Sequence, residues 1–259
     1  MAGRDPMVRR FASLLRALSV AQESGSSTTE AAARAGMPRP TAHRVLTAML
    51  DEGFVDRDHR TGRWFLGPEA YVLGMAAAAR YDVTPAARRI VAELARRTGE
   101  SAFFSVRRGD ETVCLLREDG SFPLRSHVLH EGIRFPLGVA SAGLAILSMC
   151  RPDEIDAYLA RTDLTDDWGP DHTAEAIRDR VAVTQRDGYA VNPGLIVEGS
   201  WGLGAAVFDA SGSPQWAVSL TGVESRFGED RRTELGAALL EASHAITRSM
   251  GRTVGGFPR

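Results

Sequence analysis

Residues 35–50 of the chain read AGMPRPTAHRVLTAML, and this stretch decides how the first part of the sequence is interpreted. Apolar residues recur at the three- and four-residue spacing of one helix face, which predicts an amphipathic helix. They are Ala42, Val45, Leu46, Met49 and Leu50. The other positions carry Arg39, Thr41, His43, Arg44 and Thr47. A helix with a cationic start and a polar outer face is suited to entering a groove of DNA.

The residues before this helix predict two further helices. Residues 8–24 carry apolar side chains at helical spacing. Ser27 and Glu30 then have the spacing of a capping box, and the alanines that follow favour a short helix ending at Gly36. A proline in the first turn of the third helix costs no hydrogen bond, because an N–H there has no helical partner. That helix is expected to continue to about Glu52.

Residues 53–67, GFVDRDHRTGRWFLG, predict a hairpin with a polar turn between two short strands. Three helices followed by a hairpin make a winged helix-turn-helix, in which the second helix of the pair enters the major groove. The wing would bring Arg60 and Arg63 to an adjacent backbone or minor groove, and Trp64 is expected in the wing core. The predicted DNA-binding residues are Arg39, Pro40, Thr41, His43, Arg44, Thr47, Arg60 and Arg63.

Composition places the chain among ordinary globular proteins. It has 259 residues, of which 44% are hydrophobic and 25% charged. Residues 1–80 carry 11 arginines against 8 acidic residues, although the whole chain has a net charge of −2, and no lysine occurs. No apolar run reaches the ~20 residues of a membrane helix, and the first residues lack the apolar core of a secretory signal. We therefore expect a cytoplasmic protein without a membrane partner.

The rest of the chain predicts an α+β domain. Residues 68–82 are expected to form a linker helix, residues 83–250 a second domain, and residues 251–259 a flexible tail. Strands are predicted at 101–106, 112–117, 124–129, 189–191, 202–209 and 215–222. Helices are predicted at 85–99, 140–149, 153–161, 173–188 and 229–250. Two strands divided by the turn residues DASGSP suit an antiparallel hairpin, and the order suggests helices packed on an antiparallel sheet.

The sequence resembles the IclR family of bacterial transcription regulators over about residues 8 to 250. The resemblance rests first on residues 36–67, where a glycine-apolar-proline turn precedes a threonine-x-histidine-arginine helix. The matching residues are Gly36, Met37, Pro38, Thr41, His43, Arg44, Val45 and Leu46. Pro40 departs from the family, which often has a serine there, and a proline cannot donate to a phosphate. Looser matches follow in family order at 96–106, 133–148 and 186–222.

The resemblance implies a GAF-like effector-binding domain behind the DNA-binding head, and dimers or tetramers of the chain. Ser141 could cap a helix of small residues, whose start is a site for an anion such as a carboxylate. The family's pocket would lie between this helix start, the glycine-rich loop 197–204 and the central strands. The predicted lining residues are Ala140, Ser141, Ala142, Gly199, Ser200, Gly202, Leu203, Ser219 and Thr221.

The predicted pocket departs from the family in its polarity. Many members carry an acidic pair before the loop and a cysteine in the following strand. This chain has Gly194 and Leu195 near the first positions and Trp201-Gly202 near the second. We therefore expect a less polar pocket with Trp201 as one wall, and an organic acid that is aromatic or otherwise partly apolar as the effector. Repressors and activators share this architecture.

Two other functions compete with a ligand-responsive regulator. The first is a hydrolase or amidase with an added DNA-binding head, using Ser141 or Cys114 as nucleophile and His127, His130 or His172 as base. The glycine-x-serine-x-glycine elbow of such enzymes is missing, so we expect no enzyme. A purely architectural DNA binder would not need a large acidic second domain. The two cysteines suit burial and the histidine spacing lacks further ligands, so no metal or cofactor is expected.

Overall fold

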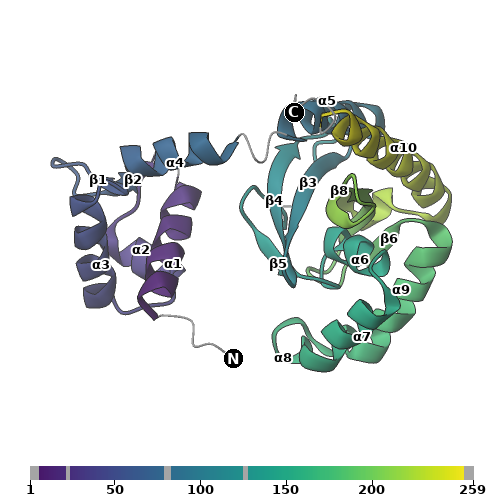
Figure 1. The fold of residues 1–259 in the computed structure, drawn as a ribbon, viewed down its shortest axis with the longest axis horizontal. Coiled ribbons are helices and arrows are strands. Elements are labelled where there is room, and N and C mark those ends of the chain that lie inside the picture. The colour runs from purple at the N-terminus through teal and green to yellow at the C-terminus, as the bar shows by residue number, and fades with distance from the viewer. Residues whose placement is uncertain (1–5, 22–23, 79–82, 125–127, 254–259) are drawn as a thin grey trace. The chain divides into compact units, whose positions relative to one another are not determined.

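The computed structural model describes residues 6–21, 24–78, 83–124 and 128–253. The chain folds as two compact units, the second beginning at Val83 (Figure 1). In its described residues, the first unit has four α-helices and a hairpin. Its elements are α1 (Pro6–Ala21), α2 (Thr28–Arg34), α3 (Arg39–Asp51), β1 (Val55–Arg57), β2 (Trp64–Leu66) and α4 (Pro68–Ala78).

The first unit is the winged helix-turn-helix that the sequence predicts. Leu14 and Leu18 of α1 meet Val45 and Leu46 of α3 in a common core, and Trp64 of the hairpin is only 1% exposed there. The indole N–H of Trp64 donates to the Thr28 hydroxyl at 2.9 Å. The expectation that this tryptophan belongs to the wing core is therefore confirmed.

Local chemistry explains where the helices of this unit begin. The Ser27 hydroxyl accepts from the Glu30 N–H at 3.2 Å, and the Glu30 carboxylate accepts from the Ser27 N–H at 2.8 Å. This is the predicted capping box, which satisfies two donors at the start of α2. α3 begins after an extended Pro38, with Pro40 in its first turn.

The second unit is built on one antiparallel sheet of six strands in the order β5-β4-β3-β8-β7-β6. The strands are β3 (Ser101–Arg108), β4 (Glu111–Glu118), β5 (Arg134–Pro136), β6 (Ala190–Pro193), β7 (Ser200–Phe208) and β8 (Pro214–Val223). The predicted hairpin around residues 209–214 joins β7 to β8. Its turn is held by the Asp209 carboxylate, which accepts from the N–H groups of Ser211 and Ser213.

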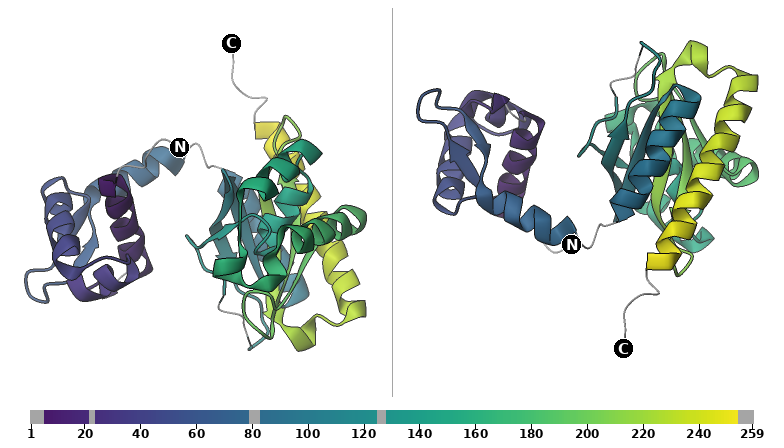
Figure 2. Two further views of the ribbon diagram at one scale, coloured as in Figure 1. Left: turned by 90° about the horizontal axis from the view of Figure 1, so that it is seen from below. Right: turned by 90° about the horizontal axis from the view of Figure 1, so that it is seen from above.

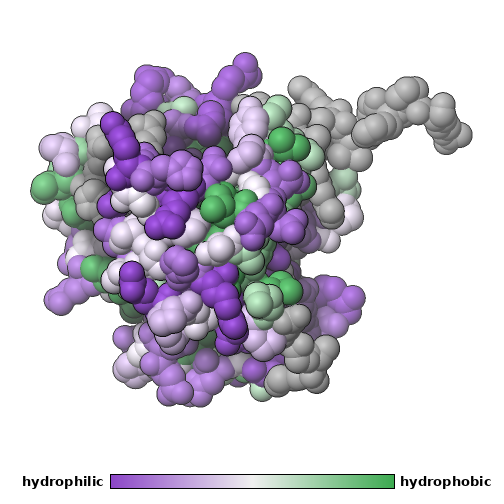
Figure 3. Space-filling model, turned by 90° about the vertical axis from the view of Figure 1, so that its left-hand side faces the viewer, coloured by the Kyte–Doolittle hydropathy of each residue, from purple (hydrophilic) through white to green (hydrophobic). Residues whose placement is uncertain are grey.

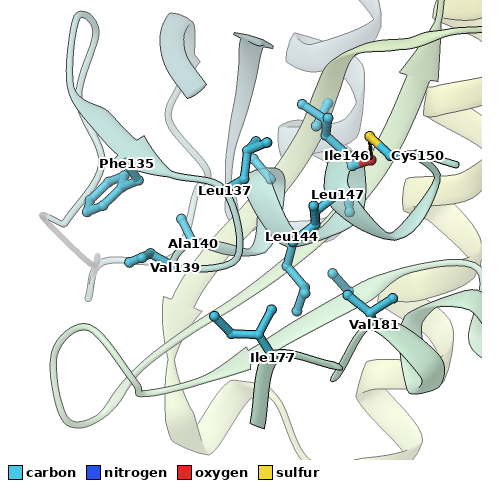
Figure 4. Close-up of a cluster of buried hydrophobic side chains, with 14 of the residues drawn as sticks. Phe135, Leu137, Val139, Ala140, Leu144, Ile146, Leu147, Cys150, Ile177 and Val181 are labelled. Carbon is cyan, nitrogen blue, oxygen red and sulfur yellow. Dashed lines mark hydrogen bonds between the residues drawn. The ribbon is translucent and has the colours of Figure 1, made fainter. Parts of the chain in front are cut away.

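Helices cover both faces of this sheet. α5 (Val83–Thr98) and α10 (Glu229–Thr253) lie side by side on one face (Figure 2). The other face carries α6 (Ser141–Ser148), α7 (Pro152–Arg161) and α9 (Ala174–Asp187). Each face has its own apolar core, and Figure 4 shows part of the one around α6, where Leu144 and Leu147 lie near Val181. We call these the α6 core and the α10 core.

Three details differ from the sequence-based expectation. The predicted strand at 124–129 is wrong at its described residues, while 125–127 lie outside the described part of the chain. The edge strand is instead β5, because the Cys114 N–H donates to the Ile133 carbonyl after the turn at Gly132. A short helix α8 (Thr165–Trp168) and a 3₁₀ turn, η3 (Pro170–His172), precede α9.

The ends of the predicted segments also shift. α10 continues to Thr253, beyond the predicted end at 250, and residues 254–259 of the expected tail lie outside the described residues. α4 covers residues 68–78 of the expected linker helix, whose last four residues are likewise not described. Within the described ranges, no helix has the length and apolar character needed to cross a bilayer.

Candidate DNA-reading surface and effector cavity

The outer face of α3 is polar and open to solvent. Ala42, Val45, Leu46 and Met49 are buried in the core of the unit. The predicted contacts lie on the opposite side: Arg39, Pro40, His43, Arg44 and Thr47 are exposed, and Thr41 is half-buried. Figure 3 shows the side on which α3 and the hairpin lie in Figure 1, and this surface is mainly hydrophilic.

The arginines of this unit fall into two groups. Arg39, Arg44 and Arg60 are exposed, and their guanidinium groups form no hydrogen bond or ion pair with any residue that the structure describes. Arg63 is different, because its guanidinium donates to the carbonyls of Ser24 at 2.8 Å and Gly25 at 3.0 Å. It also pairs with Glu30 at 3.1 Å. Arg63 therefore ties the hairpin to the start of α2, and its Nε and Nη2 donors are used within the chain.

The wing turn is organised by an aspartate. The Asp58 carboxylate accepts from the N–H groups of Arg60 at 2.7 Å and Thr61 at 3.0 Å. Hydrogen bonds from Thr61 and then Arg60 lower the pKa of Asp58, because they stabilise its charged form. Arg60 is thus held at the tip of an ordered turn.

Sequence reasoning missed Arg57 of the hairpin. Its guanidinium lies over the Trp64 ring, 5.1 Å from the centroid, and the side chain is exposed. The His43 ring meets Trp64 edge-on at a centroid distance of 6.2 Å. Trp64 thus orients one polar group of α3 and one cation of the wing. Because side chains alternate along a strand, Arg57 shares a face of β1 with the buried Val55, and in the ladder it lies opposite Trp64.

The second unit contains a small cavity of about 20 Å³ where the start of α6 meets the sheet. This is room for about one water molecule. Its lining comes from α6, the strands β6, β7 and β8, and two covering segments. The lining residues are Val128, Leu129, Ala140, Ser141, Asn192, Ile196, Ser200, Trp201, Gly202 and Thr221.

The start of α6 lies directly on the sheet and has no side-chain cap. The sequence-based expectation that Ser141 is the N-cap is wrong, because Ala140 occupies that position in extended conformation and Ser141 is the first helical residue. The helix approaches so closely because β7 carries Gly202 and Gly204 beneath it. A Cβ at Gly204 would lie 2.5 Å from the Ser141 carbonyl oxygen. A buried helix start without a cap leaves N–H groups for a ligand.

Hydroxyl groups form the floor beneath this helix start. Ser101 and Thr221 are opposite each other in the ladder, and Ser219 lies two residues before Thr221 on the same face of β8. All three side-chain oxygens are buried and lack a hydrogen-bond partner among the described residues. Thr221 reaches the cavity, whereas Ser101 and Ser219 do not line it. Among the described residues that line the cavity no side chain is charged, so the hydrogen-bond donors that the structure describes there are neutral.

Asn192 connects three parts of the cavity, and sequence reasoning missed it. Its side-chain amide N–H donates to the Val139 carbonyl, just before α6, at 2.7 Å. Its amide oxygen accepts from the Leu195 N–H, in the loop between β6 and β7, at 3.0 Å. The residue is only 5% exposed and lines the cavity. A lone asparagine in an extended segment gives no sequence signal for such a role.

The structure brings together only part of the predicted effector site. Ala140, Ser141, Ser200, Gly202 and Thr221 line the cavity. Ala142 is buried behind them in the α6 core, and Ser219 lies one step deeper along β8.

Two predicted residues lie elsewhere. The Gly199 carbonyl accepts from the Glu224 N–H at 2.9 Å, at the outer end of the loop. The prediction that Leu203 lines the pocket is wrong, because Leu203 packs in the α10 core on the far face of the sheet. The two-residue alternation of a strand could have shown that Leu203 and Gly202 point to opposite faces.

Trp201 also differs from its expected role. It borders the cavity, but its ring packs against the α10 core and lies under the Arg232 guanidinium at 5.3 Å. The aromatic ring therefore belongs to the far side of the sheet, and the apolar part of the cavity comes from Val128, Leu129 and Ile196.

The geometry gives no support to the hydrolase alternative. Burial raises the pKa of the Cys114 thiol to about 12, which keeps it protonated and unreactive at neutral pH. His172 is buried beside the Trp168 carbonyl, at 2.8 Å from its Nδ1. His130 is exposed, and His127 lies outside the described residues. Neither Ser141 nor Cys114 has a histidine partner in the described part of the structure.

Comparison with known proteins assigns both units to one family. The model described as the IclR helix-turn-helix domain matches residues 7–59, and the model described as the C-terminal domain of the bacterial transcriptional regulator IclR matches residues 75–248. The chain is 27% identical to the acetate operon repressor of Salmonella typhimurium, covering 96% of this chain and 93% of that protein. It is 28% identical to the transcriptional regulator KipR of Bacillus subtilis, covering 84% and 87%.

Solved structures agree with these matches. An IclR transcriptional regulator from Alicyclobacillus acidocaldarius superposes with a TM-score of 0.75 at 26% identity, covering 96% of this chain and all of that one. An IclR homologue from Microbacterium hydrocarbonoxydans, complexed with 4-hydroxybenzoate, has the same fold with a TM-score of 0.74 at 22% identity, covering 95% and 99%. The winged helix-turn-helix, the two-faced sheet domain and these matches agree: this chain belongs to the IclR family of bacterial transcriptional regulators.

Proposed function

We propose that the protein is a cytoplasmic transcriptional repressor that reads duplex DNA through α3 and the wing. The observation that carries this proposal is the row of unpaired, exposed cations at Arg39 and Arg44 on α3 and Arg60 on the wing. Guanidinium groups of this kind can bind phosphates or guanine edges. Repression is the activity named for the Salmonella relative. Arg63 is left out of the proposed contacts, because its Nε and Nη2 donors hold the guanidinium against residues 24, 25 and 30 within the unit.

Binding to the promoter region of the neighbouring genes tests this function. Arg39→Ala together with Arg44→Ala should weaken binding, and should lower the slope of log affinity against log salt by about 2. Arg108→Ala is the matched control, since Arg108 is also an exposed arginine but lies in the second unit. Equal affinities and slopes for the double variant and the control would refute the assignment of α3.

We also infer that a small organic acid bound at the start of α6 modulates DNA binding. This proposal is supported by the uncapped N–H groups at the start of α6, by the hydroxyl of Thr221, and by the neutral character of the described lining residues, which together suit a monoanion. The apolar side chains of Val128, Leu129 and Ile196 would contact the body of the ligand. The ligand would alter DNA binding by preferring one arrangement of the protein over another.

Calorimetric titration with a panel of acids tests the ligand class. Propionate, benzoate and 4-hydroxybenzoate share a single carboxylate but differ in size, and benzamide serves as the uncharged control. Binding by at least one acid but not by benzamide is expected. If benzamide binds as well as benzoate, the helix start does not select an anion.

Self-association is the third part of the proposal. The helix α4 exposes apolar side chains around its whole circumference, including Tyr71, Val72, Leu73 and Met75. An exposed apolar surface of this kind marks an interface. We propose that α4 and the exposed side of α1 hold two copies together, so that two copies of α3 read two half-sites.

A further inference from the structure

The loop between β6 and β7 closes the cavity that we assign to the effector. Ile196 of this loop lines the cavity, and the neighbouring Val197 is 51% exposed. Gly194 and Gly199 at the two ends of the loop have positive φ angles of 79° and 75°. Because the cavity has room for about one water molecule, an acid of several heavy atoms needs one of the covering segments to move, and this loop is one of them.

Asn192 holds the loop in its closed position. One end of its side-chain amide binds the Val139 carbonyl before α6, and the other end binds the Leu195 N–H inside the loop. A carbonyl needs a donor and an N–H needs an acceptor, so the orientation of the amide is fixed by its partners. A side chain of the same size that lacks either group would lose one of the two connections.

We propose that Asn192 is the positioning residue that sets how far this loop opens, and thereby the size of acid that the protein accepts. The proposal rests on the assignment of the cavity to an effector. Both polar groups of the Asn192 side chain are already bonded within the chain, the amide N–H to Val139 and the amide oxygen to Leu195. Asn192 therefore acts through the loop and α6, while the ligand is bound by the helix start and by Thr221.

Asn192→Asp is the sharpest test, because it keeps the size and the acceptor for Leu195 but replaces the donor to Val139 by a carboxylate. A buried carboxylate facing a carbonyl has a raised pKa, and its protonated form can donate again. At neutral pH we expect hydrogen exchange in residues 194–199 to be about tenfold faster than in the native protein. This difference should shrink as the pH falls through the raised pKa.

The native protein is measured at every pH, because His172 also faces the Val139 carbonyl and can titrate. Glu198→Gln is the matched control, since Glu198 is an exposed residue of the same loop. Unchanged exchange in N192D at neutral pH, or an equal increase in E198Q, would overturn the proposal.

A second measurement addresses the size of the ligand. In Asn192→Ala the affinity for benzoate relative to propionate should rise about tenfold, because the released loop admits the larger ring. Asn192→Ser replaces this variant if it does not fold. An unchanged ratio contradicts the role in specificity. If neither acid binds the native protein, the proposed effector class fails, while hydrogen exchange still decides the role of Asn192.

Discussion

At the scale of single residues, two arginines of the wing have different roles although they are three positions apart. The Arg60 guanidinium is exposed at the tip of the wing and has no partner among the described residues, whereas Arg63 ties the hairpin to residues 24, 25 and 30. The sequence alone shows two arginines in the wing and does not distinguish them. Their partners show that one is available for phosphate and the other stabilises the unit.

Substitution of each arginine by alanine should separate these roles. Arg60→Ala should weaken DNA binding and leave the free energy of unfolding within about 0.5 kcal/mol. Arg63→Ala should lower the free energy of unfolding by about 1 kcal/mol, because charge-assisted hydrogen bonds to a half-exposed side chain are lost. Denaturant unfolding and DNA binding at several salt concentrations check both. The reverse pattern would contradict the contacts of Arg63.

Asp58 gives a prediction for acid pH. Its pKa is lowered in the folded wing, so the turn keeps its two hydrogen bonds at neutral pH. These bonds are fully present above the ordinary aspartate pKa of about 3.9 and are lost as the pH falls through the lowered value. NMR titration of the Arg60 and Thr61 amides measures the midpoint. Asp58→Asn should abolish the step, and a midpoint above the ordinary value would be incompatible with this account.

At the scale of elements, α6 can sit on β7 only because the strand has no side chain at Gly204. Gly204→Ala should move the start of α6 away from the sheet, and should cost about 1–3 kcal/mol of unfolding free energy because the site is overpacked. The affinity for any acid bound in the cavity should fall. Gly228→Ala is the control, because a Cβ there meets nothing within 4 Å. Equal stability of the two variants would show that the helix is not held by this contact.

The sequence allowed prediction of those elements whose signals are local. The capping box at Ser27, the two faces of α3 and the wing hairpin all depend on residues within a few positions of each other. Arg63 could not be assigned in this way, because its partner Glu30 is 33 residues away. Likewise, Ser141 looks like a cap in the sequence, but the packing of α6 on the glycines of β7 decides where the helix starts.

The residues of the candidate cavity also divide into those that local sequence signals indicate and those that only the tertiary fold brings there. The helix start and the glycine strand are visible in the sequence, and five of the nine predicted residues line the cavity. Asn192, Ile196 and Leu129 come from segments whose positions depend on the fold of the whole domain. No periodicity in the sequence marks a residue that contacts a loop on one side and the start of a helix on the other.

At the scale of the whole molecule, α4 is apolar on all sides and exposed in a single chain. Leu73→Glu should therefore reduce the assembly to the mass of one chain, because a charge on this surface opposes its burial. Sedimentation equilibrium measures the mass, and DNA binding should fall with it. Val183→Glu, at an exposed apolar position in the second unit, is the control. An unchanged mass for L73E would place the interface elsewhere.

The two faces of β7 have a consequence for how mutants of this regulator would behave. Gly202 borders the cavity, while Leu203, Ala205 and Val207 of the same strand pack with α5 and α10 on the far side. If the proposed acid binds on the Gly202 face, substitutions at these three positions should leave its affinity intact and still abolish its effect on DNA binding, because the packing of β7 against α5 and α10 is altered. Variants that bind the acid but no longer respond to it should therefore cluster on the face of the sheet opposite the proposed cavity.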